Sequence, residues 1–213
     1  MRHPAHILSR ALLPLGLLLS LAGCAVPLAS SNPADGTFNR AVLRQVGGGL
    51  LPPAPVDPRY LALQEAGAPV LRMQADEGAG VALRRDGPAA DGVVRWRAPD
   101  GAAIDMRNGV VVASRSTADD LMFSDLAELQ ARLASGQPGL ARRFENRMTK
   151  DRTLQLQTYV CTVTRAASPA GPVTREDCAG PDDGFINSYG PAGGSQQRVG
   201  GRMVTFSPEG SRS

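Results

Sequence analysis

The chain has 213 residues, 42% of them hydrophobic, with 23 basic and 20 acidic side chains and a formal net charge of +3. Arg2 and Arg10 lie in the first ten residues, so the rest is nearly balanced in charge and gives little reason to expect a nucleic-acid partner. Both histidines, His3 and His6, also lie there. Removal of this end leaves no histidine for a Ser–His–Asp triad, a Cys–His pair or a histidine metal site, which excludes those classes of enzyme.

The first 23 residues have the pattern of a secretory signal. A positively charged start is followed by an apolar run over residues 11–22, which is too short for a transmembrane helix of about 20 apolar residues. The run ends in Leu21-Ala22-Gly23-Cys24, which resembles the lipobox cut by lipoprotein signal peptidase. We therefore predict a signal peptide over residues 1–23 and lipidation of Cys24. An ordinary secretory signal with an incidental cysteine is the alternative.

Lipidation at Cys24 predicts where the mature protein is held. Acyl chains contribute about 0.8 kcal/mol per buried methylene, so two or more chains anchor a protein stably. The next residue is Ala25 rather than the Asp that favours retention in the inner membrane of enteric bacteria. We expect the protein at the periplasmic face of the outer membrane. No periodic pattern marks residues 24–36, which are rich in Pro, Ser, Ala and Asn and predict a flexible tether.

Residues 37–213 are expected to form one mainly β domain: an antiparallel barrel-like or sandwich fold with one or two short helices. The first helix is expected over residues 37–46, and a Gly- and Pro-rich loop follows. Five short strands divided by Asp-Gly and Asn-Gly turns are then expected over residues 70–75, 81–85, 93–98, 103–107 and 110–114.

The Asn108-Gly109 pair predicts a two-residue β-hairpin turn, because both residues tolerate positive φ. This turn places Met106 opposite Val111 and Ile104 opposite Ala113 on one apolar face. After the hairpin, a helix is expected to begin at Thr117, with Asp120 three residues later as its partner in a variant of the capping box, and to carry a stripe at helical spacing. The stripe consists of Met122, Leu126, Leu129 and Leu133, and the helix is expected to end at Gly136 and Pro138.

Two cysteines remain after Cys24. Strands are expected over residues 152–165 and 173–178, joined by the loop at residues 168–171, and this register places Cys161 opposite Cys178. In an oxidising periplasm, directly opposed cysteines predict one disulfide. Two separate buried thiols are the alternative. Further short strands are expected over residues 184–189, 196–199 and 202–206.

Several segments together resemble a known family. They are Val94-Arg95-Trp96-Arg97-Ala98-Pro99-Asp100-Gly101, Ile104-Asp105-Met106-Arg107-Asn108-Gly109-Val110-Val111-Val112-Ala113-Ser114-Arg115, Asp120-Leu121-Met122, Tyr159-Val160-Cys161, Glu176-Asp177-Cys178, Phe185-Ile186-Asn187-Ser188-Tyr189 and Ser195-Gln196-Gln197. Their order, with the lipobox, resembles the YjbF family of lipoproteins, also called the group 4 capsule polysaccharide lipoprotein family. The resemblance covers roughly residues 37–206. It implies a mainly β accessory protein of exopolysaccharide or capsule production, with no catalytic residues to transfer.

Trp96, Arg95 and Arg97 are the candidate residues for binding a glycan or a partner. Aromatic faces bind sugars and arginines bind acidic groups, but Trp96 shares a strand face with Val94, away from both arginines. Packing of Trp96 in the core and solvation of the arginines are therefore the competing interpretation. The acidic group formed by Glu176, Asp177, Asp182 and Asp183 raises the question of carboxylate catalysis or calcium binding, but a Pro-Asp-Asp-Gly turn accounts for the aspartates.

We accordingly expect an anchored protein that assists exopolysaccharide production or secretion by binding rather than by catalysis. It has no predicted cofactor or metal, and its expected partners are the membrane, other export proteins or the polysaccharide. The alternatives are a glycan-modifying hydrolase that uses carboxylates, or a purely structural envelope lipoprotein.

Overall fold

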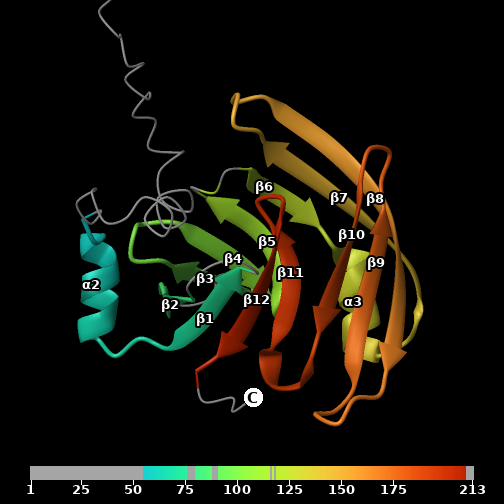
Figure 1. Ribbon diagram of the computed structural model, residues 1–213, viewed down its shortest axis with the longest axis horizontal. Helices are drawn as coiled ribbons and strands as arrows, with labels where there is room; N and C mark the ends of the chain where they lie inside the picture. The colour runs from blue at the N-terminus through green and yellow to red at the C-terminus, as the bar shows by residue number, and fades with distance from the viewer. Residues whose placement is uncertain (1–54, 76–79, 88–90, 116, 118, 210–213) are drawn as a thin grey trace, which may run out of the picture. The chain divides into compact units, whose positions relative to one another are not determined.

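The computed structural model describes residues 55–75, 80–87, 91–115, 117 and 119–209 (Figure 1). In chain order the elements are α2 (Pro58–Glu65), β1 (Val70–Ala75), β2 (Val81–Arg85), β3 (Val93–Arg97), β4 (Ala103–Arg107), β5 (Val110–Arg115), β6 (Asp120–Asp125), α3 (Ala127–Ser135), β7 (Gly139–Met148), β8 (Leu154–Ala166), β9 (Val173–Ala179), β10 (Gly184–Tyr189), the short 3-10 turn η2 (Pro191–Gly193), β11 (Ser195–Val199) and β12 (Arg202–Pro208). The predicted helix at residues 37–46 lies outside the described residues. No helix in the described part of the chain is long and apolar enough to cross a membrane.

All twelve strands of the described residues form one antiparallel sheet, in the order β5-β4-β3-β2-β1-β12-β11-β10-β9-β8-β7-β6. The two end strands, β5 and β6, come back toward each other, and the backbone N–H of Leu121 donates to Ser114 Oγ across the seam at 2.9 Å. The sheet is therefore a nearly closed barrel (Figure 1), which confirms the predicted mainly β antiparallel class and favours its barrel-like form.

The Asn108-Gly109 turn is confirmed, because φ is +51° at Asn108 and +80° at Gly109. Met106 pairs with Val111 as predicted, but Ile104 pairs with Ser114 rather than with Ala113. A β-bulge lies between Asp105 and Met106, and it shifts the register of the hairpin by one residue away from the turn. The hydrophobic pattern gives no sign of the extra residue in a bulge, so a register predicted from alternation alone is wrong beyond this point.

The predicted helix from Thr117 is wrong in its first half. Residues 120–125 form β6, paired with β7, and α3 begins only at Ala127. The predicted Thr117–Asp120 contact exists, since Thr117 N–H donates to Asp120 Oδ1 at 2.7 Å, but it closes the turn that enters a strand. Asp125 Oδ1 accepts from Ala127 N–H at 3.1 Å at the true start of the helix, and Gly136 ends it with φ of +66° as predicted.

Helix α2 was not predicted, although its start has a clear signal. Asp57 Oδ1 accepts a hydrogen bond from Arg59 N–H at 2.6 Å, and Pro58 occupies the first helical position. The helix buries Tyr60 and Leu63, and the Tyr60 hydroxyl donates to the Ala82 carbonyl oxygen at 3.1 Å. These contacts fix the helix beside the β1–β2 hairpin.

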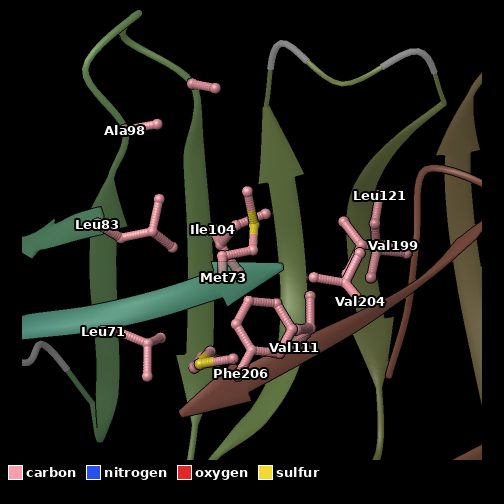
Figure 2. Close-up of a cluster of buried hydrophobic side chains, with 12 residues drawn as sticks. Leu71, Met73, Leu83, Ala98, Ile104, Val111, Leu121, Val199, Val204 and Phe206 are labelled. Atoms are coloured by element: carbon pink, nitrogen blue, oxygen red, sulfur yellow. The ribbon is translucent and has the colours of Figure 1, made fainter. Parts of the chain in front are cut away.

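The barrel interior contains three hydrophobic clusters. The largest joins β1, β2, β4, β5, β11 and β12 and includes Leu83, Ile104, Val111, Val204 and Phe206 (Figure 2). The second lies against α3 and includes Leu126, Leu129 and Val163. The third surrounds the cysteines with Tyr159 and Phe185.

Candidate functional site

A set of charged side chains is buried inside the part of the barrel formed by β7 to β11. The buried ionic network, as we define it, consists of Arg143, Glu145 and Arg147 on β7, Glu176 on β9 and Arg198 on β11. All five side chains are in the buried class, and Glu145 and Glu176 are fully inaccessible to solvent. Alternation along β7 explains the first three, because every second side chain of a strand points to the same face.

The β7 residues form a continuous ladder of ion pairs. Arg143 Nε lies 2.5 Å from Glu145 Oε1, and Arg147 Nε lies 2.7 Å from Glu145 Oε2, so each oxygen of this carboxylate has its own arginine. Arg143 Nη1 also lies 3.2 Å from both oxygens of Glu176. The fully buried Arg143 therefore links the two fully buried carboxylates.

Neutral side chains complete the environment of Glu176. The Asn187 amide donates to Glu176 Oε2 at 2.8 Å, and the Tyr189 hydroxyl donates to the same oxygen at 2.7 Å. Asn187 Oδ1 in turn accepts from the backbone N–H of Arg198 at 2.8 Å. Buried polar groups are costly unless they are hydrogen-bonded, and here the Glu176 carboxylate on β9 and the Asn187 amide on β10 both have partners.

The network reaches the rim of the barrel at two aspartates. Arg147 Nη1 lies 2.9 Å from Asp119 Oδ2, and Arg198 Nη1 pairs with Asp183. The Tyr159 hydroxyl lies 2.9 Å from Asp183 Oδ1 and accepts from Arg198 Nη2 at 2.7 Å. These rim carboxylates, which are partly exposed, add negative charge to an interior in which three arginines face two glutamates.

Arg198 is held above two aromatic rings. Its guanidinium carbon lies 3.9 Å from the centroid of Phe185 and 5.1 Å from that of Tyr159, within the range of cation–π attraction. The Nε atom of Arg198 is buried without a hydrogen-bond partner among the described residues. The same holds for the Oγ atom of Ser124, a β6 residue that lies opposite Glu145 of β7.

The electrostatics of the network keep Glu145 ionised. Burial raises the pKa of Glu145, but the positive charges of Arg143 and Arg147 and their hydrogen bonds outweigh it, so that this pKa lies below its ordinary value. Burial, together with the Glu176 carboxylate, raises the pKa of Tyr189 well above its ordinary value. An acid for glycoside hydrolysis needs a raised carboxyl pKa, which is the opposite of what Glu145 has.

The predicted disulfide is present and lies beside Glu176 of the network. Cys161 pairs in register with Cys178, their Cα atoms are 3.9 Å apart, and the sulfurs are bonded. The two sulfurs and a Glu176 carboxylate oxygen lie within 4.8 Å of one another, which is an arrangement suited to a metal ion only when the thiols are free. With the sulfurs in a disulfide and Glu176 held by Arg143, the described residues give this group no metal-binding role.

Trp96, Arg95 and Arg97 lie apart from the buried ionic network. Trp96 is partly buried and packs against the first hydrophobic cluster. Arg95 donates to both oxygens of Asp105, at 2.7 and 2.8 Å, from its Nε and Nη2. Arg97 Nε donates to Asp86 at 2.8 Å, and Arg97 Nη1 lies 3.3 Å from Asp57. Both arginines thus already have carboxylate partners, and Trp96 lies on the opposite face of β3.

The acidic residues of the tail do not converge. Glu176 points into the barrel, whereas Asp177 is exposed and pairs with Arg175 at 3.2 Å. Asp183 binds Arg198 at the rim, and Asp182 is exposed on the turn between β9 and β10. Cys24, the predicted lipidation site, lies outside the described residues.

The strand that carries most of the network is not apparent from the sequence pattern. Residues 139–148 were not predicted as a strand because β7 has the reverse of the usual pattern: charged side chains point inward, while Leu140 and Phe144 are exposed. The available signal was the period of two itself, in which Arg143, Glu145 and Arg147 occupy alternate positions.

Comparison with known proteins gives a fold relationship. No protein-family model matches the sequence, and no curated protein matches it. Among solved structures, the chain is similar to the crystal structure of the hypothetical lipoprotein YmcC from Escherichia coli K12, with a TM-score of 0.54 and 14% sequence identity. The similarity covers 83% of this chain and 95% of that chain. The two chains therefore share a fold over most of their lengths.

Proposed function

We propose that this chain is a lipid-anchored envelope protein of the YjbF type, which assists the production or secretion of an exopolysaccharide by binding. The observation that carries the proposal is the combination of a lipobox at Cys24 with a fold shared with a protein described as a lipoprotein. The ordered motifs that resemble the YjbF family supply the link to exopolysaccharide. In the proposal, the protein is held at the periplasmic face of the outer membrane.

Binding rather than catalysis is supported by the state of the buried carboxylates. Both oxygens of Glu145 are paired with arginines, and Glu176 accepts hydrogen bonds from Arg143, Asn187 and Tyr189. A pair of glycosidase carboxylates needs one protonated acid and one free base or nucleophile. The network and its neutral partners instead link the five neighbouring strands β7 to β11, so we assign it the role of a rigid support for a binding surface.

The test of this proposal is incubation of the purified protein with the exopolysaccharide of its native host. Co-sedimentation or retention on the immobilised polysaccharide, with no change in reducing ends or chain length over time, is the expected result. A pull-down from host membranes identifies export proteins as the alternative binding partner. Time-dependent cleavage that is lost in Asp183→Asn or Asp182→Asn would support a hydrolase and overturn the proposal.

A further inference from the structure

Strand β7, which carries charged side chains inward, and its two neighbours β6 and β8 expose large apolar side chains outward. On the outer face of β6, β7 and β8, the exposed fractions are 76% for Leu156, 63% for Phe123 and 57% for Leu154, and Phe144 is also exposed. Scattered apolar side chains on a surface need no explanation, but a contiguous group marks a binding surface.

The strand register makes these side chains neighbours. Asn146 of β7 is paired with Phe123 on one side and with Leu156 on the other, so the three form one row across three strands. The next row toward the hairpin turn pairs Met148 with Leu154. These outward-facing residues, Phe123, Asn146, Met148, Leu154 and Leu156, are called here the hairpin face. None of these five side chains is charged, and Asp120 of β6, which pairs with Met148, borders the face on one side.

The hairpin face lies on a part of the sheet that projects from the barrel. Strand β8 pairs with β9 only from Val160 onward, so the six residues before Val160 extend beyond the edge of β9 (Figure 1). Seven consecutive residues, from Lys150 to Leu156, are exposed. Lys150, Asp151 and Arg152 lie at the turn, so the outermost point of the hairpin has a net positive charge beside the apolar rows.

The N-terminal segment enters the domain at the same end of the barrel. The backbone N–H of Asp57 donates to the carbonyl oxygen of Pro99, in the turn between β3 and β4, at 2.6 Å. Because successive strands are antiparallel, that turn lies at the same barrel end as the β7–β8 turn. Residue 55 is only 31 positions from Cys24. A fully extended chain of that length spans at most about 110 Å, so lipid on Cys24 holds the domain within that distance of the bilayer. The chain enters the domain at the barrel end that carries the β7–β8 turn.

We propose that the hairpin face rests on the phospholipid surface that holds the N-terminal lipid, with Leu154, Leu156 and Phe123 in the interfacial region. The inference rests on the proposed anchor at Cys24. An uncharged apolar face bordered by Lys150 and Arg152 suits a leaflet of zwitterionic and anionic phospholipids, because the apolar rows leave water while the cations meet the phosphates. The lipid on Cys24 raises the local concentration of phospholipid around the hairpin, so even a weak affinity of the hairpin face for the bilayer gives a stable contact.

The test places a fluorescent label on the hairpin face of the full mature protein. With Cys161 and Cys178 in a disulfide and Cys24 lipidated, Leu156→Cys supplies one free thiol for a nitrobenzoxadiazole label. The protein is reconstituted into vesicles of phosphatidylethanolamine with a minor fraction of phosphatidylglycerol, and doxyl-labelled phospholipid serves as quencher. Thr164→Cys is the matched control, because it is exposed on the same face of the same strand but eight residues further from the turn.

The expected result is several-fold stronger quenching at position 156 than at position 164, and a loss of that difference in the background of Leu154→Asn with Phe123→Asn. Equal quenching at both positions would overturn the proposal, as would its absence at position 156. A blue shift without quenching, growing with protein density, would show a second copy on this face instead. Intact mass of the same sample reports the lipid on Cys24, so that failure of the anchor is distinguishable from failure of this contact.

Discussion

Replacement of Arg143 by Met removes the cation between two fully buried carboxylates. The substitution is similar in volume, so it leaves Glu145 and Glu176 without their shared partner while adding little strain. Glu145 retains Arg147, and Glu176 retains Asn187 and Tyr189. Breaking a buried pair by removal of one partner costs about 3–5 kcal/mol. For a domain with a free energy of unfolding of about 5–15 kcal/mol, that is a large fraction of the total.

The assay is urea unfolding of the purified protein followed by the fluorescence of Trp96, the single tryptophan, with thermal melting by circular dichroism. A loss of about 3–5 kcal/mol corresponds to a fall in Tm of roughly 6–20 °C for a chain of this size. Arg142→Met is the matched control, because Arg142 is the next residue on β7 but points outward to Glu128 on the surface. Addition of Glu176→Gln to Arg143→Met should recover part of the loss. Equal stabilities for Arg142→Met and Arg143→Met would refute the reasoning.

Three further variants probe the interior. Because the pKa of Glu145 is lowered in the folded state, its ionised carboxylate stabilises the fold above the ordinary glutamate pKa of about 4.3, and this stabilisation is lost as pH falls through the lowered pKa. Glu145→Gln should therefore unfold at lower urea concentration at neutral pH. Its free energy of unfolding should also fall less steeply than that of the wild type as the pH is lowered. Opening the 17-residue disulfide loop by Cys161→Ser with Cys178→Ser should cost about 3 kcal/mol, whereas free thiols in non-reduced wild-type protein by mass spectrometry would contradict the pairing. The Gln197 side chain binds the backbone N–H of Val111 and the backbone C=O of Gly109, and Gln197→Leu leaves both groups without this partner. The free energy of unfolding should fall by about 1–3 kcal/mol for each group, whereas Gln196→Leu, at an exposed position, should change it little in the same assay.

The fold was largely predictable where apolar side chains point inward. The strands from residue 70 to residue 115 were placed by their Asp-Gly and Asn-Gly turns, apart from the bulge near Asp105, and the position of Cys161 opposite Cys178 followed from the loop between β8 and β9. The prediction was wrong where the same local sequence pattern suits both a helix and a strand. The residues from Asp120 to Leu129 carry both a helical apolar stripe and a capping contact, but pairing with β7 makes the first six of them a strand.

The buried ionic network could not be located from hydrophobicity, because its strand is inverted. Arg143 pairs with Glu176 on β9, and Glu145 lies 3.6 Å from Arg198 on β11; both of these stabilising partners are distant in sequence. Nothing local to β7 identifies those partners. The same inversion leaves Leu156 and Phe123 outside, so the hairpin face and the network are two consequences of one pattern.

The most direct test of the proposed function is the amount of exopolysaccharide released by the native host. A strain that lacks this protein is complemented with the wild type or with Cys24→Ser, and secreted polysaccharide is measured beside membrane fractionation of the protein. The account predicts reduced release in the deletion strain, recovery with the wild type, and neither recovery nor membrane association with Cys24→Ser. Unchanged polysaccharide release in the deletion strain would contradict it.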